Sequence, residues 1–318
     1  DPITIRDDLS LKNLISLKEK FNISGFPVVN KSNKVVGIIT NRDVRFAQNM
    51  SQPISELMTK KNLITAEAGI SRKKALDILH SNKIEKLIVI DKGKRCVGLI
   101  TVTDIKKSEK YPLATKDHIG RLRVAAATGV GQDGLNRAES IFKAGADAIV
   151  LDTAHAHSKR VIDTIRAIRK IVKNNIQVIA GNIATKEAAK MLLKEKVDAI
   201  KIGIGPGSIC TTRIIAGVGV PQFSAITEIY EVTKKSKIPL IADGGIRYSG
   251  DVAKAIGAGA DCVMIGSLLA GTQESPGEVF LFQGRSYKSY RGMGSLAAME
   301  KGSSDRYFQQ DVQDKLKF

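Results

Sequence analysis

A single cysteine stands in a glycine-rich loop in the second half of the chain. Residues 203–213 read Gly-Ile-Gly-Pro-Gly-Ser-Ile-Cys-Thr-Thr-Arg and follow directly on the apolar run 198–202. Alternating glycines free the backbone to expose N–H and C=O groups toward a ligand. A cysteine on such a loop can act as a nucleophile, because the nearby N–H dipoles favour its thiolate form. We therefore interpret Cys210 as a candidate for covalent catalysis rather than as an inert residue in a tight strand-to-helix turn.

Other polar or glycine-rich segments also come directly after short apolar runs. Asp152 follows run 148–151, Asn182 follows run 177–180, and Asp243-Gly244-Gly245 follows run 239–242. Gly266-Ser267 follows the last run, 262–265. Asp-Gly-Gly alone fits a simple turn as well as it fits a binding site. Together with Gly-Ser one strand later, it is typical of a phosphate site built from loop N–H groups. Asp243 is placed to accept hydrogen bonds from ribose hydroxyls.

The elements that must position these residues alternate from about residue 111 onward. Six apolar runs (124–127, 148–151, 177–180, 199–204, 239–242 and 262–265) alternate with amphipathic stretches at 135–144, 159–172, 186–194, 223–236 and 249–256. This pattern predicts an α/β fold with a parallel sheet covered on both faces. Polar residues after the strand ends are typical of a TIM (β/α)8 barrel. A closed barrel needs eight strands, so we expect six of the eight here.

The first third of the chain contains an internal repeat. The segment Val36–Val44 recurs as Val97–Ile105, and a strand-like run and a helical pattern precede each copy. The repeat resembles a tandem CBS pair, a module that often binds adenine or guanine nucleotides. By that resemblance, the residues at the ribose and phosphate positions are Thr40, Asp43, Thr101 and Asp104. Helix capping explains Thr-x-x-Asp equally well. We expect CBS repeats at 1–50 and 51–110 and a catalytic barrel domain at 111–318.

The cysteine loop resembles the catalytic loop of the inosine-5′-monophosphate (IMP) dehydrogenase and GMP reductase family, and the resemblance covers nearly the whole chain. It implies a barrel with an inserted CBS pair. The first two strands of that barrel would precede Asp1. It also implies that Cys210 attacks C2 of the hypoxanthine, that NAD takes the hydride, and that water hydrolyses the thioimidate to xanthosine monophosphate. Thr212 resembles the hydroxyl that assists, and Arg306-Tyr307 resembles a flap pair whose arginine is the base for water.

The same resemblance assigns the binding residues. IMP contacts are implied for Ser208, Asp243, Gly244, Gly245, Gly266, Ser267, Tyr290, Gly292, Met293 and Gly294, of which Met293 and Gly294 meet the purine base. NAD contacts are implied for Asp152, Asn182, Lys201 and, on the adenosine side, His155. Carbonyl groups of Gly205, Gly207 and Cys210 would hold a monovalent cation, usually potassium.

Within the family, we expect the dehydrogenase rather than the reductase. GMP reductase is expected to lack the CBS insertion and the segments Tyr290–Ser295 and Arg306-Tyr307, which this chain has. A second hypothesis is that the chain acts only as a nucleotide-sensing CBS module. The chain opens without Met, so we expect it to be a piece of a longer protein. The resemblance implies a homotetramer, and because two barrel strands are expected to be missing, we expect the piece to be inactive or unstable by itself.

Composition argues against nucleic-acid binding, membrane insertion and a zinc site. The net charge is +18, but the lysines are scattered and not interleaved with aromatic residues, so we interpret them as a solvated surface rather than a nucleic-acid groove. No apolar run is long enough for a membrane span or a signal peptide. The three cysteines are odd in number and far apart, which indicates a reducing cytosol; we expect Cys96 and Cys262 to be buried in strands. His155 and His157 lack a third ligand for zinc.

Overall fold

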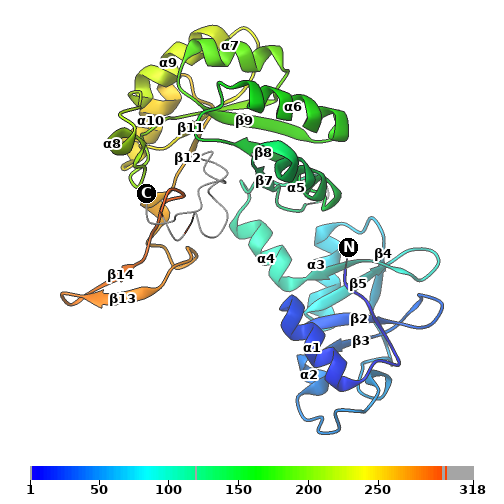
Figure 1. The fold of residues 1–318 in the computed structure, drawn as a ribbon. Coiled ribbons are helices and arrows are strands. Elements are labelled where there is room, and N and C mark those ends of the chain that lie inside the picture. The colour runs from blue at the N-terminus through cyan, green and yellow to red at the C-terminus, as the bar shows by residue number, and fades with distance from the viewer. Residues whose placement is uncertain (1, 119, 296–297, 299–318) are drawn as a thin grey trace. The chain divides into compact units, whose positions relative to one another are not determined.

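The computed structural model describes residues 2–118, 120–295 and 298. The chain divides into two compact units, Asp1–Thr115 (unit 1) and Lys116–Phe318 (unit 2). Each unit has its own sheets (Figure 1). Each also has two clusters of buried hydrophobic residues among those that the structure describes.

Unit 1 consists of two copies of one arrangement of strands and helices. Its elements are β1 (Ile5–Arg6), α1 (Leu11–Phe21), β2 (Gly25–Val29), β3 (Val35–Thr40), α2 (Asn41–Val44), η1 (Ile54–Glu56), β4 (Thr65–Glu67), α3 (Arg72–Ser81), β5 (Lys86–Ile90), β6 (Cys96–Thr101) and α4 (Val102–Lys110). In the first copy β1 pairs parallel with β2, and β2 pairs antiparallel with β3. In the second, β4, β5 and β6 pair in the same way. The sequence repeat is therefore a repeat of topology.

Both Thr-x-x-Asp segments are capping boxes at the start of a helix. The Asp43 carboxylate accepts a hydrogen bond from the Thr40 N–H at 2.7 Å, ahead of α2. The Asp104 carboxylate likewise accepts from the Thr101 N–H at 3.1 Å, ahead of α4. Each pair satisfies N–H groups that the helix itself leaves without partners. The capping interpretation is confirmed, and contact of these residues with a nucleotide stays a prediction.

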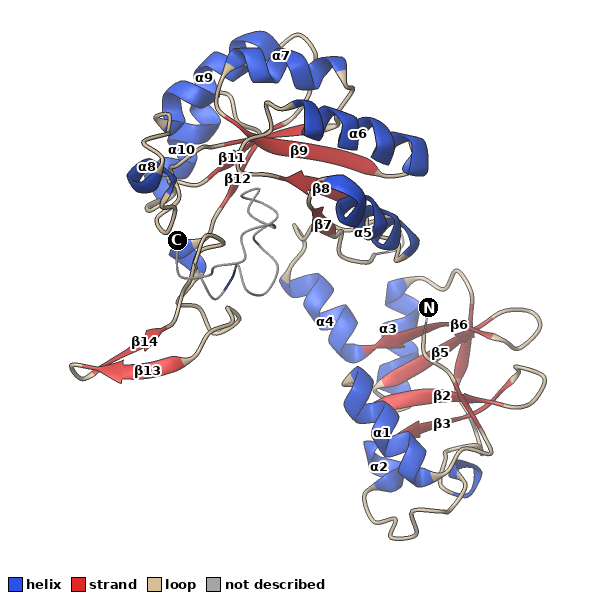
Figure 2. Ribbon diagram, in the orientation of Figure 1, coloured by secondary structure: helices blue, strands red, loops and turns tan. Residues whose placement is uncertain are grey.

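Unit 2 is built on a six-stranded parallel sheet in the order β12-β11-β10-β9-β8-β7. Its elements are β7 (Ala125–Thr128), α5 (Gly131–Lys143), β8 (Ala148–Asp152), α6 (Lys159–Val172), β9 (Gln177–Ile183), α7 (Lys186–Lys194), β10 (Ala199–Ile202), α8 (Thr212–Ile215), α9 (Gln222–Thr233), β11 (Leu240–Asp243), α10 (Ser249–Gly257), β12 (Cys262–Met264), η2 (Ser267–Leu269), β13 (Val279–Phe282) and β14 (Arg285–Lys288). The sheet is curved like half a barrel, and α5, α6, α7, α9 and α10 follow its outer side (Figure 2). Strands β13 and β14 form a separate antiparallel hairpin.

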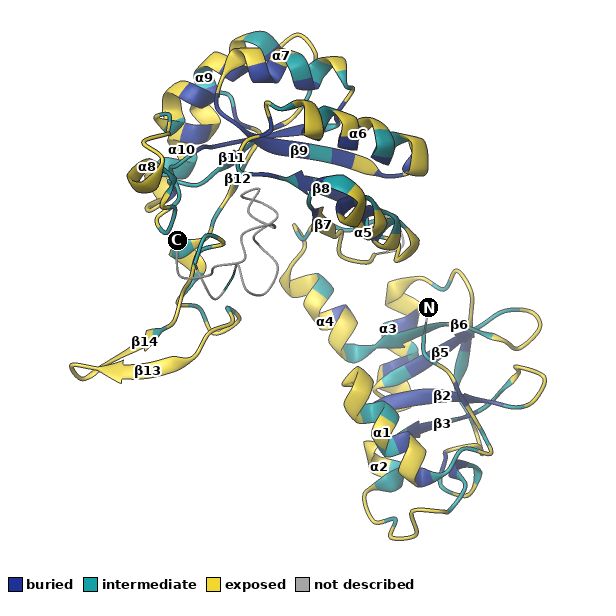
Figure 3. Cartoon of the chain, in the orientation of Figure 1, coloured by how far each residue is buried: buried dark blue, intermediate teal, exposed yellow. Residues whose placement is uncertain are grey.

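Burial is concentrated in the middle of the parallel sheet (Figure 3). Every residue of β10 is buried, and α6 packs Val161, Ile165, Ile168 and Val172 inward at helical spacing. The two edge strands, β7 and β12, are largely exposed, so the expectation of a sheet covered on both faces is wrong there. Cys262 is exposed and Cys96 only half-buried, which corrects the expectation that both are buried in strands. Cys262 belongs to β12, which has a neighbouring strand on one side only within the described sheet.

Within the described residues, no helix combines the length and the apolar character needed to cross a membrane.

Candidate functional site

The polar residues singled out from the sequence gather at the carboxyl ends of the parallel strands. Asp152 is the last residue of β8, Asn182 is next to the last residue of β9, and Asp243 is the last residue of β11. The cysteine loop connects β10 to α8. Since parallel strands all end at the same side of a sheet, segments that are far apart in the sequence meet at one edge.

A cavity of about 210 Å³ lies at this edge. Its lining includes Cys210 and all ten residues expected to contact the nucleotide: Ser208, Asp243, Gly244, Gly245, Gly266, Ser267, Tyr290, Gly292, Met293 and Gly294. Gly205, Gly207 and Asn182 also line it. The structure thus brings together in one cavity residues from the ends of four strands, β9 to β12, and from the segment after the hairpin. The expected residues Arg306 and Tyr307 lie outside the described residues.

Cys210 is held in a tight turn of its loop. Its N–H donates to the carbonyl of Gly207 at 3.1 Å, and its thiol donates to Oγ1 of Thr212 at 3.2 Å. Thr212 is the first residue of α8, so the helix fixes the hydroxyl beside the sulfur. The thiol is half-buried and lines the cavity, where a bound molecule can reach it.

Two glycines allow close approaches that shape the cavity. A Cβ at Gly203 would lie 2.0 Å from the carbonyl oxygen of Asp243, and Gly203 has a φ of 144°. A Cβ at Gly266 would lie 2.6 Å from the hydroxyl of Tyr290. Any larger residue would push the loop after β10 away from β11, or Tyr290 away from η2. The glycines therefore hold these segments together.

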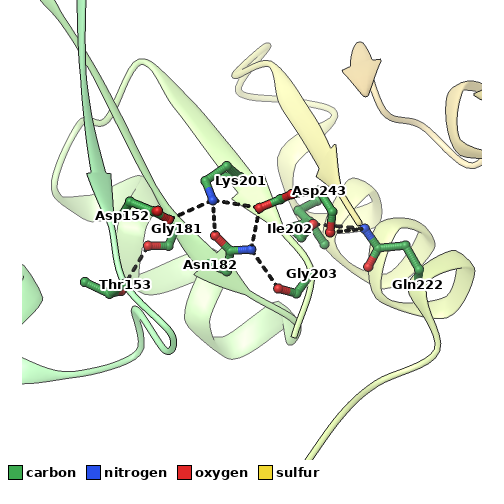
Figure 4. A network of polar contacts seen from close by, with 9 residues as sticks. All are labelled: Asp152, Thr153, Gly181, Asn182, Lys201, Ile202, Gly203, Gln222 and Asp243. Atoms are coloured by element: carbon green, nitrogen blue, oxygen red, sulfur yellow. Dashed lines mark hydrogen bonds and ion pairs between the residues drawn. The ribbon is translucent and has the colours of Figure 1, made fainter. Parts of the chain in front are cut away.

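A buried network joins four adjacent strands, β8 to β11, beside the cavity (Figure 4). Lys201 on β10 is 2% exposed, and its Nζ donates to Asp152 Oδ1 at 2.8 Å, to Asp243 Oδ2 at 2.7 Å and to Asn182 Oδ1. Asn182 Nδ2 donates to the carbonyl of Gly203 at 2.7 Å and to Asp243 Oδ2 at 2.9 Å. The amino group of Lys201, expected to face NAD, is therefore occupied by protein oxygens.

Gln222 is a residue of this site that the sequence did not reveal. Its Nε2 donates to the carbonyls of Ile202 at 2.9 Å and Asp243 at 3.2 Å, so it ties the ends of β10 and β11 together. Its Oε1 is buried and has no hydrogen-bond partner among the described residues. Gln222 follows Pro221 at the start of α9, where a polar residue is ordinary, and no pattern in the sequence singles it out.

His155 and Asp152 lie outside the lining of the cavity. Partial burial of the imidazole, together with the neighbouring His157, lowers the pKa of His155 below its ordinary value. The two rings have centroids 6.2 Å apart. In the part of the chain that the structure describes, no group of three or more His, Cys, Asp or Glu side chains is placed to hold a metal ion.

Comparison with known proteins places this site in a family. Residues 60–317 match the IMP dehydrogenase / GMP reductase domain, and residues 1–49 match the CBS domain. The chain is 55% identical over 318 residues to the inosine-5′-monophosphate dehydrogenase of Rhizobium tropici, and 53% identical over 316 residues to that of Aquifex aeolicus. These matches cover 100% and 98% of this chain but 64% of each relative, so the chain spans about two thirds or less of the length of the curated relatives.

A solved structure is similar to both units. A variant of GMP reductase from Trypanosoma brucei, in complex with guanosine 5′-monophosphate, superimposes with a TM-score of 0.84 at 36% identity over 98% of this chain and 66% of that one. Because the match includes unit 1, the expectation that GMP reductases lack the region of the CBS repeat is wrong. That region does not distinguish the dehydrogenase from the reductase.

Proposed function

The chain belongs to the IMP dehydrogenase and GMP reductase family, and from this premise we propose that the complete protein oxidises IMP to xanthosine monophosphate with NAD, in guanine nucleotide biosynthesis. The observation that carries the proposal is the position of Cys210, which lines the same cavity as Asp243 and the glycine-rich ends of β11 and β12. A nucleophile, a ribose acceptor and a phosphate cradle of N–H groups are the three parts that chemistry on a nucleotide base requires. The identities to curated IMP dehydrogenases favour the oxidative direction.

The proposed reaction has two halves that use the same cysteine. In the first, Cys210 Sγ forms a bond to C2 of the hypoxanthine and the hydride on C2 departs; bound NAD supplies the hydride acceptor. The thioimidate that remains on Cys210 is then attacked by water, the C–S bond breaks, and xanthosine monophosphate and the free thiol result. We assign Thr212 to assist this step because its hydroxyl lies 3.2 Å from the sulfur, with Arg306 of the Arg306-Tyr307 pair as the base for water.

Binding roles follow from the positions around the cavity. Loop N–H groups at Ser208, Gly245, Gly266 and Ser267 would hold the phosphate, and Asp243 would accept from the ribose hydroxyls. Met293 and Gly294, near Tyr290 and Gly292, would meet the base. We place NAD on the side of Asp152, Asn182 and His155.

We further propose a potassium ion at the carbonyl oxygens of Gly205, Gly207 and Cys210. Oxygen ligands suit a hard cation. The carbonyl of Gly207 already accepts from the Cys210 N–H but keeps a second lone pair for the ion. Three carbonyls give only part of a coordination shell, which fits the further proposal of a homotetramer in which a neighbouring subunit completes the site.

The finer statements on architecture are proposals of the same kind. We propose that the curved sheet of unit 2 is part of an eight-stranded barrel, that CBS repeats at 1–50 and 51–110 are inserted into a barrel domain continued at 111–318, and that the CBS pair binds an adenine or guanine nucleotide. We propose a cytoplasmic enzyme that binds neither membrane nor nucleic acid.

GMP reductase is the second candidate, because the structure of such an enzyme matches 98% of the chain. The two candidates differ in the direction of electron flow. An absorbance assay with IMP and NAD should show NADH formation if the protein is the dehydrogenase, whereas a reductase should instead consume reduced cofactor when GMP is supplied. A protein that does neither but binds nucleotides through unit 1 would support the CBS module hypothesis.

The decisive test replaces Cys210 by Ser in the complete protein. NADH formation should be abolished while binding of IMP persists, and mass spectrometry of the wild type with IMP and NAD should find the covalent adduct on Cys210. Cys262→Ser is the matched control, because Cys262 is exposed and outside the cavity. Normal turnover in Cys210→Ser would end the proposal.

A further inference from the structure

Lys201 is an unusual residue for its place in the fold. All residues of β10 are buried, and Lys201 is the one charged residue in that strand. A buried ammonium group is costly unless charged partners surround it. Here the partners come from three other strands: the carboxylates of Asp152 on β8 and Asp243 on β11, and the amide oxygen of Asn182 on β9 (Figure 4). One lysine thus connects four adjacent strands at the edge that carries the cavity.

The lysine acts on one oxygen of Asp243. Oδ2 accepts from Lys201 Nζ at 2.7 Å and from Asn182 Nδ2 at 2.9 Å. Oδ1 has no hydrogen-bond partner among the described residues, and Asp243 lines the cavity with about a fifth of its side chain exposed, 22%. The two bonds to Oδ2 therefore fix the rotation of the carboxylate and leave Oδ1 to accept from a bound molecule.

The same Nζ also holds the carboxylate of Asp152, at 2.8 Å. Asp152 does not line the cavity, and its side chain is 23% exposed. We propose that Lys201 is a positioning residue that holds Asp243 and Asp152 as one charged unit, so that the acceptor for the nucleotide's ribose and the carboxylate on the cofactor side depend on a shared cation. This deepens the proposed function and rests on it, since Asp243 is taken to bind the ribose of IMP.

Loss of the ammonium group would have a specific consequence. Without it, two carboxylates held close to one nitrogen repel each other in a partly buried setting, where screening is weak. Asp243 would turn away from the position that Oδ1 needs. Removing the charge of Asp152 as well would relieve that repulsion, although Oδ2 would still lack its cation. Asp152→Asn should therefore restore part of the IMP affinity that Lys201→Met loses.

The test is a double-mutant cycle in the complete protein, with the Kd of IMP measured by calorimetry in the absence of NAD. Lys201→Met should raise the Kd several tens of fold, in the range expected for a lost charge-assisted hydrogen bond. Asp152→Asn alone should change it less than twofold. Lys201→Met/Asp152→Asn should bind at least threefold more tightly than Lys201→Met, but about tenfold more weakly than Asp152→Asn.

A merely structural lysine predicts a different pattern. In that case Asp152→Asn would change the Kd of IMP by the same factor in Lys201→Met as in the wild type. Such additivity would overturn the proposal. If Lys201→Met alone does not fold, the double variant takes its place, because it loses one charge of each sign. Its Kd for IMP is compared with that of Asp152→Asn, and equal values would overturn the proposal. Lys190→Met, on the exposed side of α7, is the control for loss of a lysine. A wild type that does not bind IMP would refute the proposed function instead.

Discussion

The thiol of Cys210 donates a hydrogen bond to the hydroxyl of Thr212 at 3.2 Å. The two residues flank the start of α8, so the turn and the helix together fix the distance. In this arrangement, the threonine oxygen lies beside the sulfur that is proposed to form a bond to C2 of the base and to leave again when water attacks C2. The neighbouring Thr211 has no side-chain capping bond to the helix, which makes it a useful comparison.

Replacing Thr212 by Val should separate binding from chemistry. Valine keeps the branched shape but removes the hydroxyl, so the Kd of IMP should stay near the wild-type value. Turnover should fall by about 10²-fold, the lower range for loss of a group that assists proton transfer. Steady-state NADH formation gives the turnover number. Thr211→Val should stay within a fewfold of wild type, and equal losses in both variants would argue against a specific role for Thr212.

Gln222→Met should weaken the connection between β10 and β11. Two hydrogen bonds to backbone carbonyls are lost, but so is the buried Oε1 that lacks a partner, and we expect a net loss of about 1 kcal/mol in the free energy of unfolding. Because Asp243 is released at its backbone, the KM for IMP should rise several-fold. Urea unfolding and steady-state kinetics measure the two effects. Gln177→Met, at an exposed position in β9, should change neither.

Local features of this fold could be predicted from the sequence because they depend on nearby residues. Thr40 and Asp43 are three residues apart, and so are Thr101 and Asp104; each pair forms its capping box within one helical turn. The apolar runs in the middle of the parallel sheet became strands, with ends shifted by one to three residues. Helix α5 begins at Gly131, four residues before the amphipathic pattern indicates, because its first turn is polar and glycine-rich.

Long-range features were much harder to predict. Lys201 joins Asp152 and Asp243 across four strands, and no spacing along the chain encodes that meeting. The exposure of Cys262 depends on the position of β12 at the edge of the described sheet, whereas its neighbours in sequence are those of a buried strand. Asp243-Gly244-Gly245 and Gly266-Ser267 were expected at one site because each follows a strand, whereas Tyr290, Gly292, Met293 and Gly294 were expected there only because the family resemblance named them.

The pair His155 and His157 gives a prediction about pH. Partial burial first, and the charge of His157 second, lower the pKa of His155 below the value of about 6.5 expected for a free imidazole. The unfolded chain therefore binds the proton more readily, and the contribution of His155 to stability should be lost as pH falls below about 6.5. His155 is only partly buried, so the effect on stability should be small.

NMR titration of the imidazole signals can check this directly. The His155 midpoint should lie below that of a free imidazole, and His157→Gln should move it upward without restoring it completely, because burial remains. Comparison with His155→Gln assigns the signal. A midpoint that does not move in His157→Gln would show that the second histidine has no influence, and a midpoint above about 6.5 would contradict the proposed burial effect.

Arg306 should act late in the reaction. We propose it, on the family resemblance, as the base for water, which is needed only after the hydride has left. In the complete protein, Arg306→Ala should therefore leave the first hydride transfer near normal, since Cys210 and the cavity residues around it are unchanged. Hydrolysis should slow by about 10²–10⁴-fold, the usual loss for a positioned base. The thioimidate on Cys210 should then accumulate.

Rapid mixing with IMP and NAD distinguishes this role from others. The Arg306→Ala variant should give a burst of NADH close to one per active site, followed by a very slow steady phase, and mass spectrometry should find the adduct on Cys210. A surface arginine without a catalytic role predicts near wild-type turnover and no adduct. If the burst and the steady phase are slowed together, Arg306 acts at or before hydride transfer, because a base used only in hydrolysis cannot delay the step that precedes it.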